Sequence, residues 1–443
     1  MISLKVGILM KKFIKICEYI LLLLFLVLVP FFTNKLVSFC VIPIFFLFSY
    51  FSKKIPDKYY VFVLFGIAFL IRIISIFFLK VEIVDDFLTM LKASRSLLEG
   101  NLDFMKTSYF MFFSYQVGHV LYQALLLSIH NSVIFLKIVN SIITSFSVVL
   151  LYLIGKRIVK EETAKKISIF YLLYFYPVYL NSVLTNQLLP ALLSLIAVYY
   201  YITHGDSLKK MVIVGGLFVI ANFFRTESII WIGAIFLYQL LVEKGNLKKR
   251  IGQSGLLLIS YFAFSLLFTN IVFISPIHSK LNNQYPGWKF YCGLNVEHNG
   301  FYNVEDQNVY FSSNHKEELL KKRILHDKFQ LPVLFLKKEV ILWTQTNYDL
   351  RLKGSLPKMF LLFNQGFLNI ILLLFIIGLI PNKKDTKKEI LLLKLLLGMY
   401  YVIYLMIEIS PRYAYIMHFL VFLLVGSGIE RVEEWLKKLC KKY

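Results

Sequence analysis

The feature that most limits the fold of this chain is a series of apolar segments that are close in length to the thickness of a lipid bilayer. A helix needs about 20 apolar residues to cross a hydrocarbon core of about 30 Å. Twelve segments reach or approach this length: 13–31, 36–51, 59–78, 132–154, 167–182, 188–202, 211–224, 229–242, 251–274, 359–380, 390–409 and 413–425. We therefore expect an all-α polytopic membrane protein with about twelve transmembrane helices.

Composition and charge point to the same class of protein. Hydrophobic residues make up 58% of the 443 residues, and the mean hydropathy is +0.68. A soluble domain of this size needs more polar residues to cover its surface. The formal net charge of +23 is carried by short Lys and Arg clusters between the apolar segments, a pattern typical of cytoplasmic loops. We expect a lipid bilayer around the chain and no nucleic-acid partner.

The same basic clusters predict the orientation of the chain in the membrane. If both termini are cytoplasmic, every cluster lies on the cytoplasmic side, as expected for a plasma-membrane protein. The segments then left outside are 80–131, 181–187, 225–227, 275–358 and 408–412. The predicted regions are N-terminal transmembrane helices (1–79), a first extracytoplasmic loop (80–131), further transmembrane helices (132–274), a large extracytoplasmic loop (275–358), and C-terminal transmembrane helices with a basic tail (359–443).

The first outer loop opens with two adjacent acids, Asp85 and Asp86. Apolar residues then recur at three- and four-residue steps, at Phe87, Met90, Leu91, Leu97 and Leu98. This spacing predicts an amphipathic juxtamembrane helix that lies along the membrane surface. A second apolar stretch, 120–129, is too short for a span and predicts a surface or re-entrant helix. Asp86 could cap the first helix, act as a general base, or do both.

The large outer loop has a mixed composition. Residues 282–288 are rich in turn formers, 315–329 are charged and predict a helix, and 331–346 are apolar with Trp343. The last of these segments is suited to lying at the membrane interface.

Two arginines in the outer turns are candidates for binding an anion. Arg225 follows an apolar segment; it could reach lipid headgroups, or Glu227 could neutralise it. Arg412 follows Glu408 and Pro411 in the last predicted outer turn. Arginine is disfavoured on the extracytoplasmic side of a membrane protein. A carboxylate, an anionic headgroup or an anionic substrate would each explain its position.

The sequence contains no recognisable cofactor site. The eight histidines and four cysteines show no metal-ligand spacing, and no Gly-rich phosphate loop is present. We predict no metal and no cofactor, although a divalent cation stays an open possibility.

Four features, in this order, carry a resemblance to a known family. They are Asp85-Asp86-Phe87 with the segment ending at Gly100, Ser114-Tyr115-Gln116-Val117-Gly118-His119-Val120-Leu121 leading into 136–157, Asn181-Ser182-Val183-Leu184-Thr185-Asn186-Gln187, and Glu408 with Arg412-Tyr413. With these features the chain resembles the GT-C class of membrane glycosyltransferases, and most of all its family 39, protein-mannosyltransferase-like and aminoarabinose-transferase-like branch. It departs from that pattern in two additional apolar spans before the acidic loop, and in Asn186 where many members carry Glu.

The resemblance implies a GT-C fold and the transfer of a sugar from a polyprenyl-phosphate-linked donor to an extracytoplasmic acceptor, with inversion. It favours Asp86, with Asp85 as the alternative, as the base. Arg225, Arg412 and, more weakly, Lys80 are the candidates for binding the donor phosphate. The residues predicted to contact substrate are Tyr115, Gln116, Asn186, Glu408 and Tyr413. The acceptor would be a cell-envelope glycan, lipid or protein.

Two other functions compete with this interpretation. A polysaccharide polymerase or ligase would place its chemistry on the Lys and Arg residues of the loop 275–358, and an arginine scan in which only Arg323 and Arg351 mattered would favour it. A flippase or transporter of lipid-linked sugars would use ionisable residues within spans and symmetric halves. Arg72 is the clearest residue of that kind, but the sequence shows no symmetry to accompany it.

Overall fold

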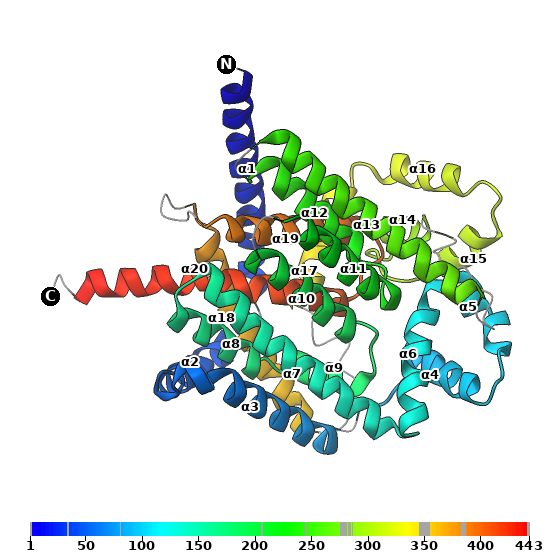
Figure 1. Cartoon of the computed structure of the whole chain (residues 1–443), viewed down its shortest axis with the longest axis horizontal. Coiled ribbons are helices and arrows are strands. Elements are labelled where there is room, and N and C mark those ends of the chain that lie inside the picture. Colours follow the sequence, from blue (N-terminus) through cyan, green and yellow to red (C-terminus); the bar gives the residue numbers. More distant parts are fainter. Residues whose placement is uncertain are drawn as a thin grey trace.

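The computed structural model describes residues 2–32, 35–79, 81–204, 207–243, 246–274, 281, 285, 287–344, 355–381 and 387–440. This part of the chain is helical and contains no strand, which confirms the all-α class (Figure 1). The helices of the first half are α1 (Ile2–Leu26), α2 (Lys35–Lys54), α3 (Asp57–Phe78), α4 (Asp85–Leu98), α5 (Ser108–Phe112), α6 (Val117–Ile129), α7 (Val133–Ile158), α8 (Glu161–Leu173), α9 (Phe175–Val183), α10 (Leu188–Thr203) and α11 (Leu208–Phe224). Those of the second half are α12 (Ser228–Leu241), α13 (Leu247–Ile274), α14 (Trp288–Gly293), α15 (Val304–Ser312), α16 (Lys316–Asp327), α17 (Leu331–Thr344), α18 (Ser355–Leu379), α19 (Lys388–Met406) and α20 (Ala414–Cys440).

Among the described residues, eight helices are long and apolar enough to cross a membrane, fewer than the twelve predicted. They comprise Ile14–Phe31, Lys35–Lys54, Asp57–Phe78, Val133–Ile158, Leu247–Val272, Met359–Leu379, Lys388–Met406 and Pro411–Cys440. The other four expected segments are also helical, but α10, α11 and α12 are short and 167–182 is divided between α8 and α9. The break falls at Tyr174 because Pro177 cannot donate a backbone hydrogen bond, and its ring crowds the carbonyl of Leu173.

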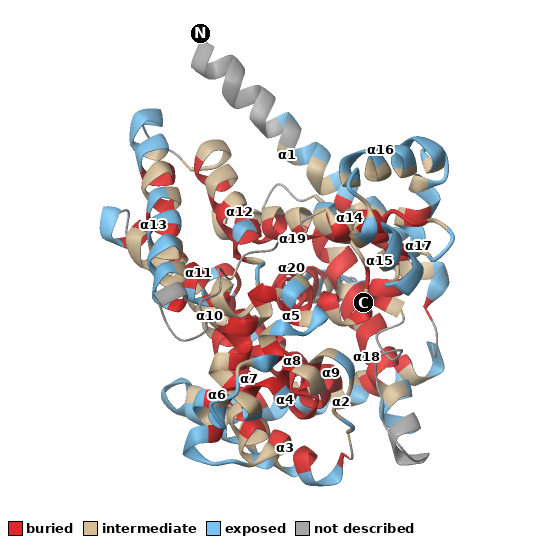
Figure 2. Ribbon diagram, turned by 90° about the vertical axis from the view of Figure 1, so that its right-hand side faces the viewer, coloured by how far each residue is buried: buried red, intermediate tan, exposed pale blue. Residues whose placement is uncertain are grey.

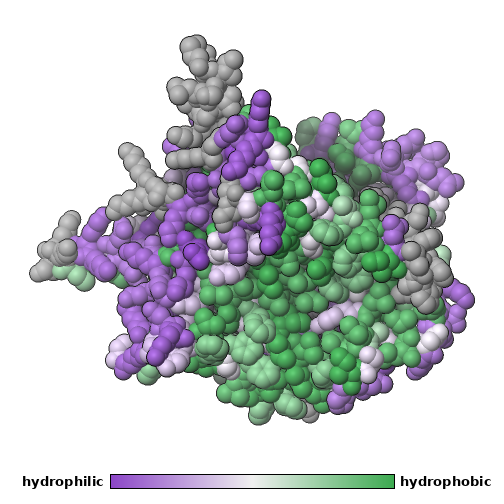
Figure 3. Space-filling model, viewed as in Figure 1, coloured by the Kyte–Doolittle hydropathy of each residue, from purple (hydrophilic) through white to green (hydrophobic). Residues whose placement is uncertain are grey.

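A broad apolar surface suits the chain to a bilayer. Figure 3 shows a continuous hydrophobic face between a hydrophilic left-hand end and hydrophilic groups at the right-hand edge. On α3, the side chains of Phe62 and Phe78 are 75% and 79% exposed; on α13, Ile259 and Leu266 are 66% and 65% exposed. Large apolar side chains left uncovered in this number fit contact with lipid rather than water.

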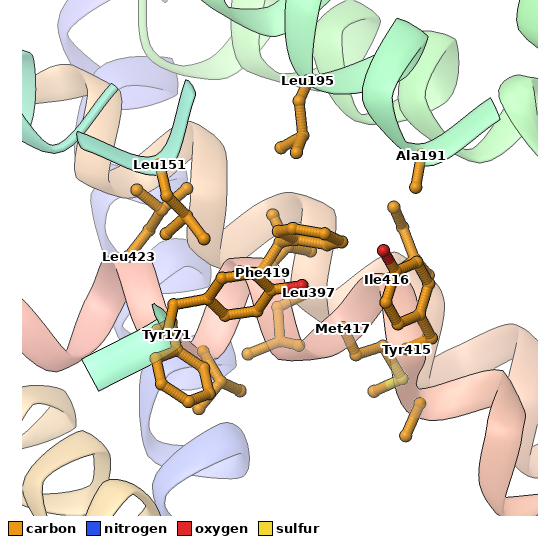
Figure 4. Packing of buried hydrophobic residues seen from close by; sticks show 14 of the residues in the cluster. Leu151, Tyr171, Ala191, Leu195, Leu397, Tyr415, Ile416, Met417, Phe419 and Leu423 are labelled. Carbon is orange, nitrogen blue, oxygen red and sulfur yellow. The ribbon is translucent and has the colours of Figure 1, made fainter. Parts of the chain in front are cut away.

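Helix α20 forms the centre of the bundle. In its most apolar 18-residue window, 94% of the residues are buried, and buried residues concentrate around it in Figure 2. Figure 4 shows Phe419 and Leu423 of α20 close to Tyr171 of α8 and Leu151 of α7. The rings of Tyr171 and Phe419 are 4.9 Å apart between centroids. A span enclosed on every side can be apolar around its whole circumference.

Several of the basic loops lie together at one end of the bundle. Lys165 forms an ion pair of 2.6 Å with Asp57, and Lys53 forms one of 3.3 Å with Glu162. Lys166 pairs with Glu433 of α20. The segments that connect α2 to α3 and α7 to α8 and the C-terminal part of α20 therefore lie on the same side of the bundle.

Most helices of the segments predicted as the first outer loop (80–131) and the long outer loop (275–358) lie at the end of the molecule opposite the C-terminus, whereas α17 lies nearer the centre (Figure 1). Helix α4 buries Phe87, Met90 and Leu91 and packs along α6, where Ser94 Oγ donates to the carbonyl of Val120 at 3.1 Å. Helix α17 was expected at the membrane interface, but one of its faces is packed in the core and Trp343 is fully buried. The rim of the cavity described below is built from these loops.

Candidate active site

A cavity of about 540 Å³ lies where the first outer loop, the long outer loop and three short turns between helices meet. Nine of the ten residues predicted for the site line it: Asp85, Asp86, Tyr115, Gln116, Asn186, Arg225, Glu408, Arg412 and Tyr413. The tenth, Lys80, lies outside the described residues. Segments that are far apart in the sequence thus contribute to one concave surface, the usual form of a small-molecule site.

The acidic pair opens α4. The helix starts at Asp85, and its N-cap residue is Val84, whose side chain makes no capping bond. The interpretation of Asp86 as the cap of a helix starting at Phe87 is therefore wrong. Asp85 has a φ of +51°, a left-handed conformation that costs a residue with a Cβ about 1–2 kcal/mol. Strain of this kind concentrates at functional sites.

Asp86 forms a loose ion pair with Arg412 across the cavity. The distance from Arg412 Nη2 to Asp86 Oδ2 is 3.5 Å, and the two side chains are 27% and 44% exposed. The guanidinium also lies 5.1 Å from the ring centroid of Phe87. A pair this long and open is weak, so the Asp86 carboxylate stays accessible to a molecule in the cavity.

Arg225 belongs to a chain of polar groups in the cavity wall. Its Nε donates to Glu227, its Nη1 donates to Asn186 Oδ1 at 3.1 Å, and its side chain is 15% exposed. The guanidinium carbon lies 5.4 Å from the ring centroid of Tyr413. Arg225 therefore does not reach out to headgroups; Glu227 neutralises it, and the pair forms part of the cavity.

Asn186 extends this chain toward the first outer loop. Its Nδ2 donates to Gln116 Oε1 at 2.7 Å, while its Oδ1 accepts from Arg225. An amide can accept and donate at once, whereas a carboxylate in this position could not donate to Gln116. The carboxylate that pairs with Arg225 comes from Glu227 instead, which explains why an amide suits position 186 in this chain.

The turn between α19 and α20 is held by bonds to neighbouring segments. Gln187 Nε2 donates to the carbonyl of Arg412 at 3.0 Å, and the Tyr413 hydroxyl donates to Glu408 Oε1 at 3.3 Å. The backbone N–H of Glu408 donates to the carbonyl of Lys289 at 2.7 Å. These bonds fix the direction of Arg412 relative to α4.

Lys289 lines the cavity and was not predicted. It lies on α14 in the long loop, half-buried, with its Nζ 5.5 Å from the ring centroid of Tyr413. No carboxylate of the described residues lies within ion-pair distance of its amine. Burial disfavours its charged form, but Tyr115, Tyr413 and Glu408 outweigh that effect and raise the pKa of Lys289. The ammonium thus stays charged at neutral pH and above.

The rest of the lining is largely aromatic or polar and was also absent from the predicted set. These residues are Phe87, Met90, Ser108, Tyr109, Phe112, Phe113, Trp288, Tyr302 and Gln307. The composition of the loops offered no signal that would single them out, because the chain is rich in aromatic residues throughout.

Gly118 lets the first outer loop approach Arg225 closely. A Cβ at this position of α6 would overlap the carbonyl oxygen of Phe223, at the end of α11. Phe223 lies two residues before Arg225, so the absence of a side chain at Gly118 brings Gln116 and Arg225 to the same cavity.

We expect Gly118→Ala to destabilise this junction by about 1–3 kcal/mol, since a backbone carbonyl must move to accommodate the added methyl group. The measurement is the midpoint of thermal unfolding in detergent. Gly252→Ala is the control, because a Cβ at Gly252 would meet nothing within 4 Å. Equal midpoints for both variants would contradict the close contact.

Residues on which the competing functions depend lie elsewhere. Arg323 donates to the carbonyl of Tyr291 and to Asp306 Oδ1, both at 2.7 Å, and holds α14, α15 and α16 together. Arg72 is fully buried and donates to Thr144 Oγ1 at 2.9 Å, which ties α3 to α7. Neither lines the cavity, and Arg351 lies outside the described residues.

Among the described residues, no group of three or more His, Cys, Asp or Glu side chains is arranged to hold a metal ion.

No protein-family model matches this chain, and no curated protein matches its sequence.

Proposed function

We propose that the protein is an integral membrane glycosyltransferase. It takes a sugar from a polyprenyl-phosphate-linked donor and transfers it, with inversion, to an extracytoplasmic glycan, lipid or protein of the cell envelope. One observation carries the proposal: a single cavity, built by the outer loops, combines the accessible carboxylate of Asp86 with the cations Arg225, Lys289 and Arg412. Carboxylates and cations in one cleft are what acid–base chemistry on an anionic substrate requires.

In the proposed reaction, a hydroxyl of the acceptor attacks the anomeric carbon of the donor sugar. The new bond joins the acceptor oxygen to that carbon, and the bond from the carbon to the phosphate oxygen breaks. The phosphate leaves with the bonding electron pair on its oxygen and stays attached to its polyprenyl chain. Asp86 accepts the proton of the hydroxyl as the attack proceeds, and attack from the face opposite the phosphate inverts the configuration.

The phosphate gains negative charge as it leaves, so cations already in place lower the barrier. Arg225 is neutralised by Glu227, and Arg412 is loosely paired with Asp86. Lys289 has no such carboxylate partner among the described residues, so we assign it the main contact with the phosphate. Arg225 and Arg412 would supply further positive potential from the sides.

The proposal includes the topology and location derived from the sequence. The eight long helices, together with α10, α11, α12 and the α8–α9 pair, would make up about twelve spans of a GT-C fold. The membrane would be the plasma membrane, with both termini cytoplasmic. The clustering of the basic loops at the end away from the cavity supports this orientation.

Mass analysis of envelope glycans and lipid-linked sugars, in cells with and without the protein, tests the function directly. We expect cells that lack it to lose one sugar from an envelope glycan, lipid or protein. The corresponding polyprenyl-phosphate sugar should accumulate, because its consumption stops. Unchanged glycans and lipid-linked sugars would contradict the proposal.

Purified protein in vesicles provides the second arm of this test. If it moves lipid-linked sugars across the bilayer and transfers none of them, the protein is a transporter rather than a transferase.

A further inference from the structure

Lys338 of α17 is a buried lysine whose amine binds three main-chain carbonyls. Its side chain has no exposure to solvent. The Nζ atom donates to the carbonyl of Gly293 at 2.9 Å, of Leu405 at 2.7 Å and of Ile407 at 2.6 Å. All three N–H groups of an ammonium are thereby used, and none goes to a carboxylate.

These carbonyls belong to the C-terminal ends of two different helices. Gly293 is the last residue of α14, and Leu405 and Ile407 flank the last residue of α19. The last carbonyls of a helix have no N–H partner within it, and the end of the helix dipole is negative. The amine of Lys338 lies between the two ends and donates to both, so Lys338 acts as a cap that α14 and α19 share. Burial lowers its pKa to about 7, so the amine carries its full charge only below neutral pH.

Each of the two capped segments carries a residue that lines the cavity. Helix α14 carries Lys289, and the chain that leaves α19 carries Glu408. The two segments are also bonded to each other, since the N–H groups of Glu408 and Ile409 donate to the carbonyls of Lys289 at 2.7 Å and of Gly300 at 2.8 Å. A Cβ at Gly293 would overlap the backbone of Ile407. No side chain separates the segments, and Lys338 lies beneath their junction.

We propose that Lys338 is a positioning residue that locks α14 onto the turn after α19 and so places Lys289 in the cavity. The lock itself is a matter of structure, while its importance for sugar transfer rests on the proposed function. Lys338 does not line the cavity, so it acts on substrate only through the segments it joins.

Amide hydrogen exchange at Glu408 and Ile409 tests the lock without any substrate. In Lys338→Met, three buried carbonyls lose the donor that they share. Burial lowers the pKa of Lys338 to about 7, so the exchange is measured below pH 7, where the amine is charged and its bonds are worth about 1.5–3 kcal/mol. We expect exchange at these amides to accelerate about ten- to hundredfold under that condition. Lys338→Arg keeps a cation with several donors and should restore much of the protection. If Lys338 only filled space, Lys338→Met and Lys338→Arg should show the same exchange rates, since Met fills the site as well as Arg does.

Lys337→Met is the matched control. Lys337 is the exposed neighbour on α17, with one bond of 3.1 Å to Asn299 Oδ1. Its loss should leave exchange at Glu408 and Ile409 within about twofold of wild type. Gly293→Ala, which keeps Lys338 but pushes the two segments apart, should accelerate the same amides and serves if Lys338→Met does not fold.

Unchanged exchange at Glu408 and Ile409 in Lys338→Met and in Gly293→Ala would overturn the lock, whatever reaction the protein performs. Accelerated exchange establishes the lock independently of the reaction. Accelerated exchange with normal envelope glycans would count against the proposed function of the cavity, so failure of the lock and failure of the function give different results.

Discussion

Replacing Asp86 with asparagine should lower sugar transfer by about 10²–10⁴-fold, the usual effect of removing a general base. Asparagine keeps the size of the side chain and still accepts a hydrogen bond from Arg412, but it cannot take the proton of the acceptor hydroxyl. The measurement is the amount of the transferred sugar in envelope glycans of cells that carry only the variant. The purified variant should match wild type in its detergent elution profile and thermal midpoint.

Asp103→Asn is the control for this experiment. Asp103 belongs to the same outer loop, but it is exposed, pairs with Lys106 at 2.7 Å and does not line the cavity. Its replacement should leave transfer unchanged. Near-normal transfer in Asp86→Asn would contradict the assignment of Asp86 as the base. A larger loss of transfer in Asp85→Asn than in Asp86→Asn would assign the base to Asp85.

Replacing Lys289 with methionine should lower transfer by about 10²–10³-fold, in line with the loss of one preorganised group that stabilises developing charge. The loss should fall mainly on kcat, because the charge on the phosphate grows as the bond to the sugar breaks. Lys289→Arg keeps the positive charge and should retain part of the activity. The measurement is the rate of transfer by purified protein, once the glycan comparison has identified the donor.

Lys322→Met on α16 is the control for Lys289→Met. Lys322 is an exposed lysine of the same long loop and lies outside the cavity lining, so transfer should be unaffected. If the two lysine variants behave alike, the contact between Lys289 and the phosphate is not part of the reaction.

The sequence predicted the helices well because their signals are local. Apolar length and the helical spacing of polar residues depend only on neighbours in the chain. The number of spans was predicted less well, since a buried helix can be as apolar as a membrane helix while remaining short. Helix α12 has 14 residues, and Pro177 interrupts another expected span at Tyr174. Length and hydropathy alone do not distinguish these cases.

The start of α4 illustrates what local patterns miss. The spacing of apolar residues predicted a helix from Phe87 that Asp86 could cap, whereas the helix begins at Asp85 in a left-handed conformation. The surrounding structure must stabilise such a backbone, because it is unfavourable in isolation. Similarly, the burial of Trp343 depends on α19, whose Tyr401 accepts a hydrogen bond from its indole.

Lys289 could not be singled out from the sequence for a related reason. The long outer loop contains several lysines, and nothing near position 289 distinguishes it from Lys322. What places it in the cavity is the docking of α14 on the turn that carries Glu408, with the Glu408 N–H bonded to the Lys289 carbonyl. That contact joins residues more than a hundred positions apart.

By itself, the sequence determined that the chain is helical and suited to a membrane, and which acids and arginines share the predicted outer side. These properties follow from the lengths of the apolar segments and from the positions of the charged residues, both of which are visible in the sequence alone. Only the tertiary structure decided that Asp86 faces Arg412, 326 positions away, and that Lys289 lies in the same cavity. Such distances depend on how helices pack and on glycines such as Gly118 that permit close approach, and packing is a property of the whole chain.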